Sequence, residues 1–275
     1  MQIYKNLDIG TAKPTREEMK NVPHHMIDIV PPTEQFSVER YCALASQKIK
    51  EVYGRGKLPI MVGGTGLYID NTVLATTFSA PQRNEELCNE LLEFAKQNGN
   101  EALFDILLRK DASAASKLHP NDTKRVIRAI ETLRTTGKTR NELDKESRPL
   151  VSPYDFLYMA IDMDRSVLYG RIDRRVDMML DCGLVEEVKK YILPVRKDMS
   201  TALTAIGYRE VLWYLDGLCT YNEMCSLLKR NTRRYAKRQL TWLRKNDNIK
   251  WLDYKDALNQ AQKQLKEHLT RQKGF

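Results

Sequence analysis

The sequence offers little that could cross-link the chain or hold a structural metal. Its five cysteines are odd in number and scattered, and no two stand at C-x-x-C spacing, which argues against a zinc site or a disulfide framework. Reduced cysteines of this kind are typical of a cytosolic protein. His24 and His25 are adjacent and cannot converge on one ion, so we assign no metal to them. The cysteines are Cys42, Cys88, Cys182, Cys219 and Cys225.

Long apolar runs, internal repeats and low-complexity tracts are also absent. No apolar run approaches the ~20 residues of a membrane span, and the N-terminus has no signal-peptide pattern. We therefore expect a soluble, cytoplasmic protein without a membrane partner. The 275 residues suffice for a large core, and the net charge of +9, with a pI near 9.2, favours an acidic partner such as nucleic acid or phosphate.

A phosphate-binding P-loop is missing from the sequence. Gly137, Lys138 and Thr139 resemble the end of the pattern G-x-x-x-x-G-K-[ST], but Thr132 stands where the first glycine is needed. A helical pattern, not a strand, precedes them, so Gly137 is better interpreted as a helix C-cap. A nucleotide kinase or another P-loop NTPase is therefore poorly supported, and ATP binding would be its test.

The most informative stretch present is LPIMVGGTGLY, at 58–68. Residues 58–62 predict a strand buried on both faces of a parallel sheet. The glycines that follow allow a sharp turn and the close approach of a ligand to the main chain, beyond the carboxyl end of the strand. Thr65 supplies the only side chain there that can do chemistry. Such a turn is structural about as often as it is functional.

The surrounding pattern predicts an α/β core interrupted by helices. A strand at 26–30, a helix from the N-cap Ser37 to about Arg55 and the strand at 58–62 form one unit of a parallel sheet. Further strands are expected at 157–163 and 249–252. We assign 1–80 and 151–275 to the core and 81–150 to an all-helical insertion. The other expected helices are 84–98, 101–109, 112–118, 121–135, 165–181, 185–192, 202–215, 221–244 and 255–271.

The helix near the C-terminus carries charge of one sign. Six basic side chains recur at spacings of three and four, and no acidic residue falls between Ser226 and Asn246. Solvated helix faces usually mix signs, so this stripe favours polyphosphate binding over a merely solvated face. The six are Lys229, Arg230, Arg233, Arg234, Lys237 and Arg238.

Two smaller basic clusters leave two interpretations open. Lys124, Arg125 and Arg128 stand at the head of a helix of the insertion, where they could hold RNA or simply follow a helix cap at Asn121 or Asp122. A second group lies on the helix at 165–181 among acidic residues, and internal ion pairs would explain it equally well. That group is Arg171, Arg174 and Arg175, interleaved with Asp173 and Asp177.

Several stretches together resemble the tRNA dimethylallyltransferases, in the family's order along nearly the whole chain. The resemblance implies a P-loop-NTPase-like parallel sheet flanked by helices, with a helical insertion that grips the tRNA anticodon stem-loop. It implies transfer of a dimethylallyl group from dimethylallyl diphosphate to the exocyclic amino group of the adenine 3′-adjacent to the anticodon, with Mg²⁺, by a monomer. The stretches are MQIYKNLDIGTAKPT, PHHMIDIV, GKLPIMVGGTGLYI, HPNDTKRVIRAIE, AIGYREV and KRNTRRYAKRQLTWLRK.

In that family, the segment matching Met1 follows a first strand, a P-loop and an Asp-Ser pair. The Asp, which resembles the general base for the adenine amino group, would lie two positions before Met1. From this we expect a chain that lacks the first strand, the P-loop, the base and the family's metal ligand, and that is inactive by itself. A missing general base alone would cost ~10²–10⁴ in rate.

The resemblance assigns roles to residues that match the family's motifs. Thr65 would line the reaction channel and contact the target adenine, and Arg175 would help to hold the diphosphate. Gln2, Thr65 and Cys88 are expected to contact tRNA, although Cys88 replaces a frequent arginine. Lys124, where glutamine is usual, lies in a further tRNA-contacting run of Lys124, Arg125, Val126, Ile127 and Arg128. The RNA backbone is assigned to Arg233, Arg234, Lys237 and Arg238.

A different class of function remains open, that of a non-catalytic tRNA-binding remnant that keeps the insertion and the basic helix. It predicts tRNA affinity that falls with salt, with a log–log slope of about −0.7 to −0.9 for each phosphate neutralised.

Overall fold

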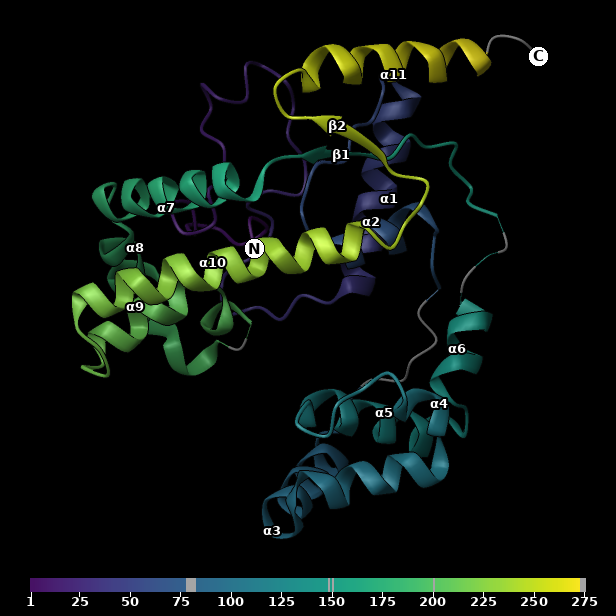
Figure 1. Cartoon of the computed structure of the whole chain (residues 1–275), viewed down its shortest axis with the longest axis vertical. Coiled ribbons are helices and arrows are strands. Elements are labelled where there is room, and N and C mark those ends of the chain that lie inside the picture. Colours follow the sequence, from purple (N-terminus) through teal and green to yellow (C-terminus); the bar gives the residue numbers. More distant parts are fainter. Residues whose placement is uncertain (78–82, 148, 150, 200, 273–275) are drawn as a thin grey trace. The chain divides into compact units, whose positions relative to one another are not determined.

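The computed structural model describes residues 1–77, 83–147, 149, 151–199 and 201–272. The chain divides into two compact units, which we describe separately. The first consists of Met1–Thr72 and Asp155–Phe275, and the second of Val73–Tyr154. Figure 1 shows the elements of both.

Parallel strands form the sheet of the first unit. β1 (Met159–Asp162) pairs with β2 (Lys250–Asp253), with Met159 opposite Lys250 and Asp162 opposite Asp253. Both strands lie within a residue or two of their predicted positions. α11 (Ala257–Gln272) follows β2 directly and packs against it (Figure 1). The expected α/β class, with helices beside a parallel sheet, is confirmed.

The strand predicted at 58–62 is wrong. This segment has no strand geometry, and Ile60 and Val62 are 76% and 90% exposed. Within the described chain, no backbone hydrogen bond joins 58–62 to another segment. An apolar run becomes a buried strand only where a neighbouring strand completes its hydrogen bonds, and no described segment does so here.

The strand predicted at 26–30 is reduced to a single parallel bridge between Tyr4 and Val30. Met26 and Asp28 adopt left-handed φ values of 63° and 55°, which interrupt an extended strand. The prediction is therefore wrong for most of this segment.

Helices follow the sequence signals more closely. α1 (Val38–Gly54) begins after Ser37, whose side chain accepts a hydrogen bond from the Arg40 amide, so the predicted N-cap is confirmed. α2 (Gly66–Val73) begins within the glycine-rich segment and was not predicted. α7 (Arg165–Asp181) has its predicted bounds and is capped by the Asp164 carboxylate.

The remaining helices of this unit form a layer beside α7. They are α8 (Leu184–Tyr191), α9 (Tyr208–Leu215), α10 (Tyr221–Leu243) and the short 3₁₀ segments η1 (Leu193–Asp198) and η2 (Ala202–Thr204). α10 packs against α7 and α9, and the core contains fully buried Leu184, Val188, Ile192, Tyr208 and Met224. The single helix predicted at 202–215 is split because Gly207 has φ +100°.

The second unit is helical throughout its regular elements. α3 (Glu85–Lys110) is interrupted at Gly99, where φ is 87°, which reproduces the two helices predicted there. α4 (Ala112–Ala115) and α5 (Thr123–Thr136) were predicted, whereas α6 (Arg140–Ser147) was not. Gly137 ends α5 in the left-handed conformation, which confirms it as a C-cap. α3 and α5 pack together around Leu91, Leu103, Leu107, Val126 and Ile130.

A buried carboxylate ties these two helices together. Glu131 is 1% exposed, accepts from the Arg128 guanidinium at 2.6 Å and from the Asn84 amide, also at 2.6 Å. Burial raises the pKa of Glu131, but these two hydrogen bonds outweigh it and leave the pKa below its ordinary value.

We expect Glu131→Gln to lower the free energy of unfolding by about 1–3 kcal/mol at neutral pH, because a charged acceptor is lost from a buried site. Since the folded-state pKa is depressed, this stabilisation is present above pH 4.5, the unfolded value, and is lost as the pH falls through the folded pKa. Denaturant unfolding at several pH values measures it. Exposed Glu101→Gln on α3 is the control, and an equal loss in both variants would contradict the prediction.

Candidate functional site

The glycine-rich segment lies directly on α10. A Cβ atom on Gly64 would fall 2.1 Å from Nε2 of Gln239, and one on Gly66 would fall 2.1 Å from Cδ1 of Trp242. The hydroxyl of Thr65 lies 3.4 Å from that of Tyr235. These α10 residues are spaced by four and three and so share one face. Glycine is therefore needed for contact with the helix, and Thr65 is placed at its surface.

A hydrogen bond also joins α2, which begins within the glycine-rich segment, to α10. The indole Nε1 of Trp242 donates to Oδ2 of Asp70 on α2 at 2.7 Å. Because Asp70 follows Thr65 by little more than one helical turn, the bond fixes the turn that carries Thr65 against α10. The sequence predicted Thr65, but it gave no sign of the Asp70–Trp242 pair.

Part of the basic stripe on α10 pairs with acidic residues of α7. Lys229 lies 2.6 Å from Asp177, and Arg233 lies 2.5 Å from Asp173. The hydrogen bond with Asp177 raises the pKa of Lys229. The prediction that the basic stripe binds a polyphosphate therefore does not extend equally to all six cations, because Lys229 and Arg233 are already paired. Asp173 and Asp177 bind α10 instead of the arginines beside them on α7.

The other basic side chains of α10 face solvent. Arg230, Arg234, Lys237 and Arg238 are exposed, and among the described residues no carboxylate lies within 4.0 Å of their charged groups. The guanidinium of Arg238 lies 5.5 Å from the ring centre of Tyr235, whose hydroxyl lies 3.4 Å from that of Thr65. Of these cations, Arg238 therefore lies beside the surface on which the Thr65 segment rests.

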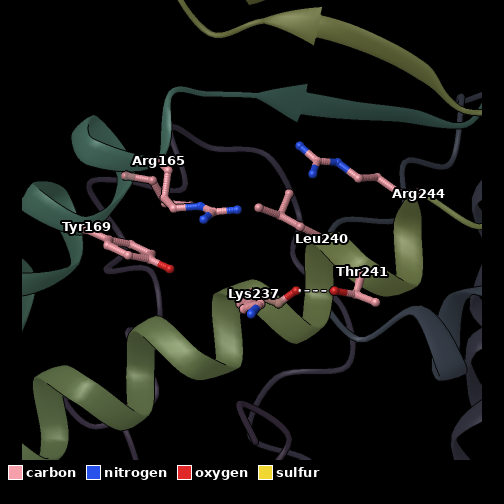
Figure 2. Close-up of a pocket in the computed structure, with 7 residues that line it drawn as sticks. Arg165, Tyr169, Lys237, Leu240, Thr241 and Arg244 are labelled. Carbon is pink, nitrogen blue, oxygen red and sulfur yellow. Dashed lines mark hydrogen bonds between the residues drawn. The ribbon is translucent and has the colours of Figure 1, made fainter.

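A pocket of about 210 Å³ opens between α7 and α10 (Figure 2). Three cations line it, together with an aromatic ring and aliphatic carbons, and Arg244 is partly neutralised by Asp162 at 3.8 Å. Such a lining suits an anionic group of modest size. Sequence reasoning did not select Arg165 or Arg244. The lining residues are Arg165, Leu168, Tyr169, Lys237, Leu240, Thr241 and Arg244.

Arg175 is placed apart from these contacts. It lies on α7 and is exposed, next to the buried Val176. Within the described chain, no ion pair or ring contact joins Arg175 to another residue, so its guanidinium is available to a ligand. The structure shows no contact between Arg175 and Thr65, and their joint role stays a prediction.

Gln2 is anchored within the N-terminal loop. Its side-chain nitrogen donates to the carbonyls of Thr11 at 3.1 Å and Ala12 at 2.9 Å. The amide oxygen is then the group with which Gln2 can accept a hydrogen bond from RNA.

The predicted tRNA-contacting residues of the second unit fall into two groups. Lys124 and Arg125 are exposed at the start of α5, with Arg125 3.4 Å from Asp122, and Arg128 is committed in part to Glu131. Charged groups at a helix start can position RNA phosphates. The contacts predicted for these cations remain untested.

The other three side chains predicted to contact tRNA are in the core of the second unit. Val126, Ile127 and Cys88 are 0%, 6% and 5% exposed. The α5 pair packs on α3, so the side chains are not at the surface of the unit. The sequence match identified the run correctly as part of one helix, but only its hydrophobic periodicity could separate packing from surface positions.

No helix among the described residues is long and apolar enough to span a bilayer. No group of three or more histidine, cysteine or acidic side chains in the same residues is arranged to hold a metal ion. We derive no step through Mg²⁺.

The fold and this surface define an α/β protein with a cationic helix under a glycine-rich loop. The sequence model described as IPP transferase matches residues 2–246. The tRNA dimethylallyltransferase of Halalkalibacterium halodurans is 46% identical over 258 residues, which are 94% of this chain and 82% of that protein. The tRNA dimethylallyltransferase of Acetivibrio thermocellus is 46% identical over 267 residues, 97% of this chain and 85% of that protein.

Solved structures agree. The full-length tRNA isopentenylpyrophosphate transferase of Bacillus halodurans matches with a TM-score of 0.71 and 41% identity, covering 98% of this chain and 86% of that one. A eukaryotic dimethylallyltransferase acting on tRNA matches with a TM-score of 0.74 and 28% identity, covering 92% and 65%. The chain belongs to the IPP transferase family. It is by family a prenyl-transferring enzyme, as its sequence predicted.

Proposed function

We propose that this chain takes part in the transfer of the dimethylallyl group of dimethylallyl diphosphate to the exocyclic amino group of the adenine 3′-adjacent to a tRNA anticodon. The observation that carries this proposal is the contact of the Thr65 segment with α10, a helix that also carries exposed cations. A hydroxyl group held on a helix with exposed cations suits a base that is bound next to an RNA backbone. The family's activity supplies the reaction.

The bond changes define what the residues must do. The adenine nitrogen attacks C1 of the dimethylallyl group, the C1–O bond breaks, diphosphate leaves and the amino group loses one proton. Thr65 contacts the adenine through its hydroxyl, and Arg175 stabilises the charge that develops on the leaving diphosphate. Arg233, Arg234, Lys237 and Arg238 bind RNA phosphates, with Arg233 limited by its ion pair with Asp173. No general base is assigned among the 275 residues.

The partners and setting follow from the same proposal. The tRNA anticodon stem-loop is held by Gln2, by the exposed Lys124 and Arg125 and, in part, by Arg128. Val126, Ile127 and Cys88 support this contact from the core of the second unit. The enzyme acts as a cytoplasmic monomer, and Mg²⁺ enters with the diphosphate.

The test is dimethylallyl transfer to an unmodified tRNA. The 275-residue polypeptide is expected to transfer very little, because its sequence has no P-loop to hold the diphosphate. Fused to the upstream P-loop and Asp-Ser segment of a relative, it should transfer the group at a rate that Thr65→Ala and Arg175→Ala reduce. Efficient transfer by the 275 residues alone would show that the base and the diphosphate site are assigned wrongly.

A non-catalytic tRNA-binding protein is the second candidate, because the exposed cations of α5 and α10 do not depend on the chemistry. It predicts salt-dependent tRNA binding with no transfer even in the fused protein. Transfer by the fused protein would eliminate it.

A further inference from the structure

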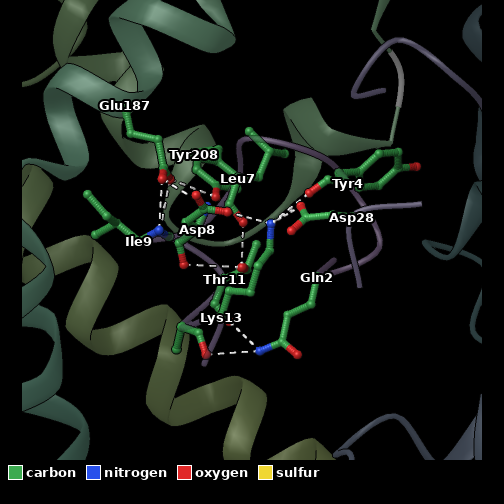
Figure 3. Close-up of polar contacts among 12 residues, drawn as sticks. Gln2, Tyr4, Leu7, Asp8, Ile9, Thr11, Lys13, Asp28, Glu187 and Tyr208 are labelled. Carbon is green, nitrogen blue, oxygen red and sulfur yellow. Dashed lines mark hydrogen bonds and ion pairs between the residues drawn. The ribbon is translucent and has the colours of Figure 1, made fainter. Parts of the chain in front are cut away.

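We propose that Glu187 is a positioning residue for tRNA binding, which sets the N-terminal loop (residues 2–13) so that Gln2 presents its amide to the RNA. This inference rests on the proposed function, because it takes tRNA as the ligand of Gln2. The observation behind it is a buried carboxylate that gathers four hydrogen bonds, three of them from consecutive backbone amides (Figure 3).

The Glu187 carboxylate binds three consecutive backbone amides and one hydroxyl group. Its Oε2 accepts from the amides of Asp8 and Ile9, both at 2.8 Å, and its Oε1 accepts from the Gly10 amide at 3.0 Å. The hydroxyl of Tyr208 donates to the same Oε1 at 2.9 Å. Glu187 is 7% exposed, so these charge-assisted bonds are made away from water.

Tyr208 on α9 contacts both Glu187 and the loop from the other side. It is fully buried, and its ring lies so close to Gly10 that a Cβ atom there would fall 2.5 Å from the ring. Burial, followed by the charge of Glu187, raises the pKa of the Tyr208 hydroxyl, so it remains a donor at all physiological pH values. The loop at 8–10 is thereby held between α8 and α9.

Further hydrogen bonds connect residues 8–10 to the side chain of Gln2. The Thr11 hydroxyl donates to the Leu7 carbonyl at 2.6 Å, and the Gln2 amide donates to the Thr11 and Ala12 carbonyls. Lys13 donates to the Tyr4 carbonyl at 3.0 Å and pairs with Asp8 (Figure 3). Moving residues 8–10 would therefore move the carbonyls that orient Gln2.

A purely structural role does not require this arrangement. A buried carboxylate loses its hydration, and a well-packed apolar side chain often stabilises a core as well or better. A carboxylate differs from an apolar side chain because its two oxygens hold three successive amides in fixed orientations. The hydrogen-bond network then ends at the Gln2 side chain, whose amide oxygen accepts no hydrogen bond from any described residue.

The test is a double-mutant cycle in the full chain, with dissociation constants for an unmodified tRNA. Gln2→Ala and Glu187→Gln are each expected to raise Kd about tenfold, near the upper end of the scale for one hydrogen bond. The double variant should bind no more weakly than the weaker single variant, because both act on one contact. Glu186→Gln, exposed on the same helix, should leave Kd unchanged.

Multiplied effects, or a Kd in Glu187→Gln equal to that of the wild type, would overturn the inference while leaving the proposed function intact. Failure of the wild-type chain to bind tRNA would overturn both. If Glu187→Gln does not fold, as judged by thermal unfolding, Tyr208→Phe removes only one of the four donors. It should raise Kd two- to threefold alone and have no further effect on Gln2→Ala.

Discussion

Replacing Arg234, Lys237 and Arg238 together by glutamine is expected to raise the Kd for tRNA about 100-fold near 0.1 M salt. These three side chains are exposed on α10 without carboxylate partners among the described residues. Each phosphate that they neutralise releases bound counterions from the RNA. The slope of log K against log salt should therefore become shallower by about 2–3 in the triple variant. Filter binding or fluorescence titration over a range of salt measures both quantities.

Two controls separate this effect from net charge and from stability. Lys263, Lys266 and Arg271 are exposed on α11, and their triple replacement by glutamine removes the same charge from another helix. It should leave the salt slope nearly unchanged. Lys229→Gln breaks the ion pair with Asp177 and should affect unfolding more than the slope. An unchanged slope in the α10 variant would show that RNA binds elsewhere.

Gly66→Ala is expected to lower dimethylallyl transfer by the P-loop-fused protein about 100-fold. The new methyl group would overlap the Trp242 indole, 2.1 Å from its Cδ1, so the segment bearing Thr65 must move away from α10. A displacement of about 1 Å at a reacting group can cost 10²-fold in rate. The overlap should also lower the free energy of unfolding by about 1–3 kcal/mol, partly offset by the better helix propensity of alanine.

The same segment provides the matched control for this prediction. A Cβ atom on Gly63 would meet nothing within 4 Å, so Gly63→Ala should transfer at close to the wild-type rate. Gly64→Ala should lie between the two, because it meets the flexible end of Gln239. Trp242→Leu should restore part of the stability lost in Gly66→Ala, because the smaller side chain removes the overlap. Equal rates for Gly63→Ala and Gly66→Ala would contradict the placement of Thr65 on α10.

Local signals predicted the helices well. Ser37 caps the helix that it was expected to cap, and Gly137 ends α5 as expected, because each acts through its own neighbouring backbone. α7 begins and ends at its predicted residues for the same reason. The residues that determine where such a helix begins or ends all lie within a few positions of each other in the sequence.

Features that depend on distant partners were not predictable. The apolar run at 58–62 resembles a buried strand, but burial needs a neighbouring strand that a local pattern cannot supply. Asp173 pairs with Arg233 across 60 residues, and Glu187 binds the loop at 8–10 across nearly 180. At the candidate site, Thr65 was predicted from the residues around it. The face of α10 beneath it was visible only once the chain had folded.

The contact between α10 and the glycine-rich segment also constrains protein engineering. Tyr235, Gln239 and Trp242 support the Thr65 loop, while Arg234, Lys237 and Arg238 on the same helix are exposed to solvent. A chimaera that takes this helix from a relative, in order to change which RNA it accepts, would therefore also replace the residues that contact the Thr65 segment. Residues 63–70 would have to be exchanged together with the helix, as one cassette, for turnover to survive the change in specificity.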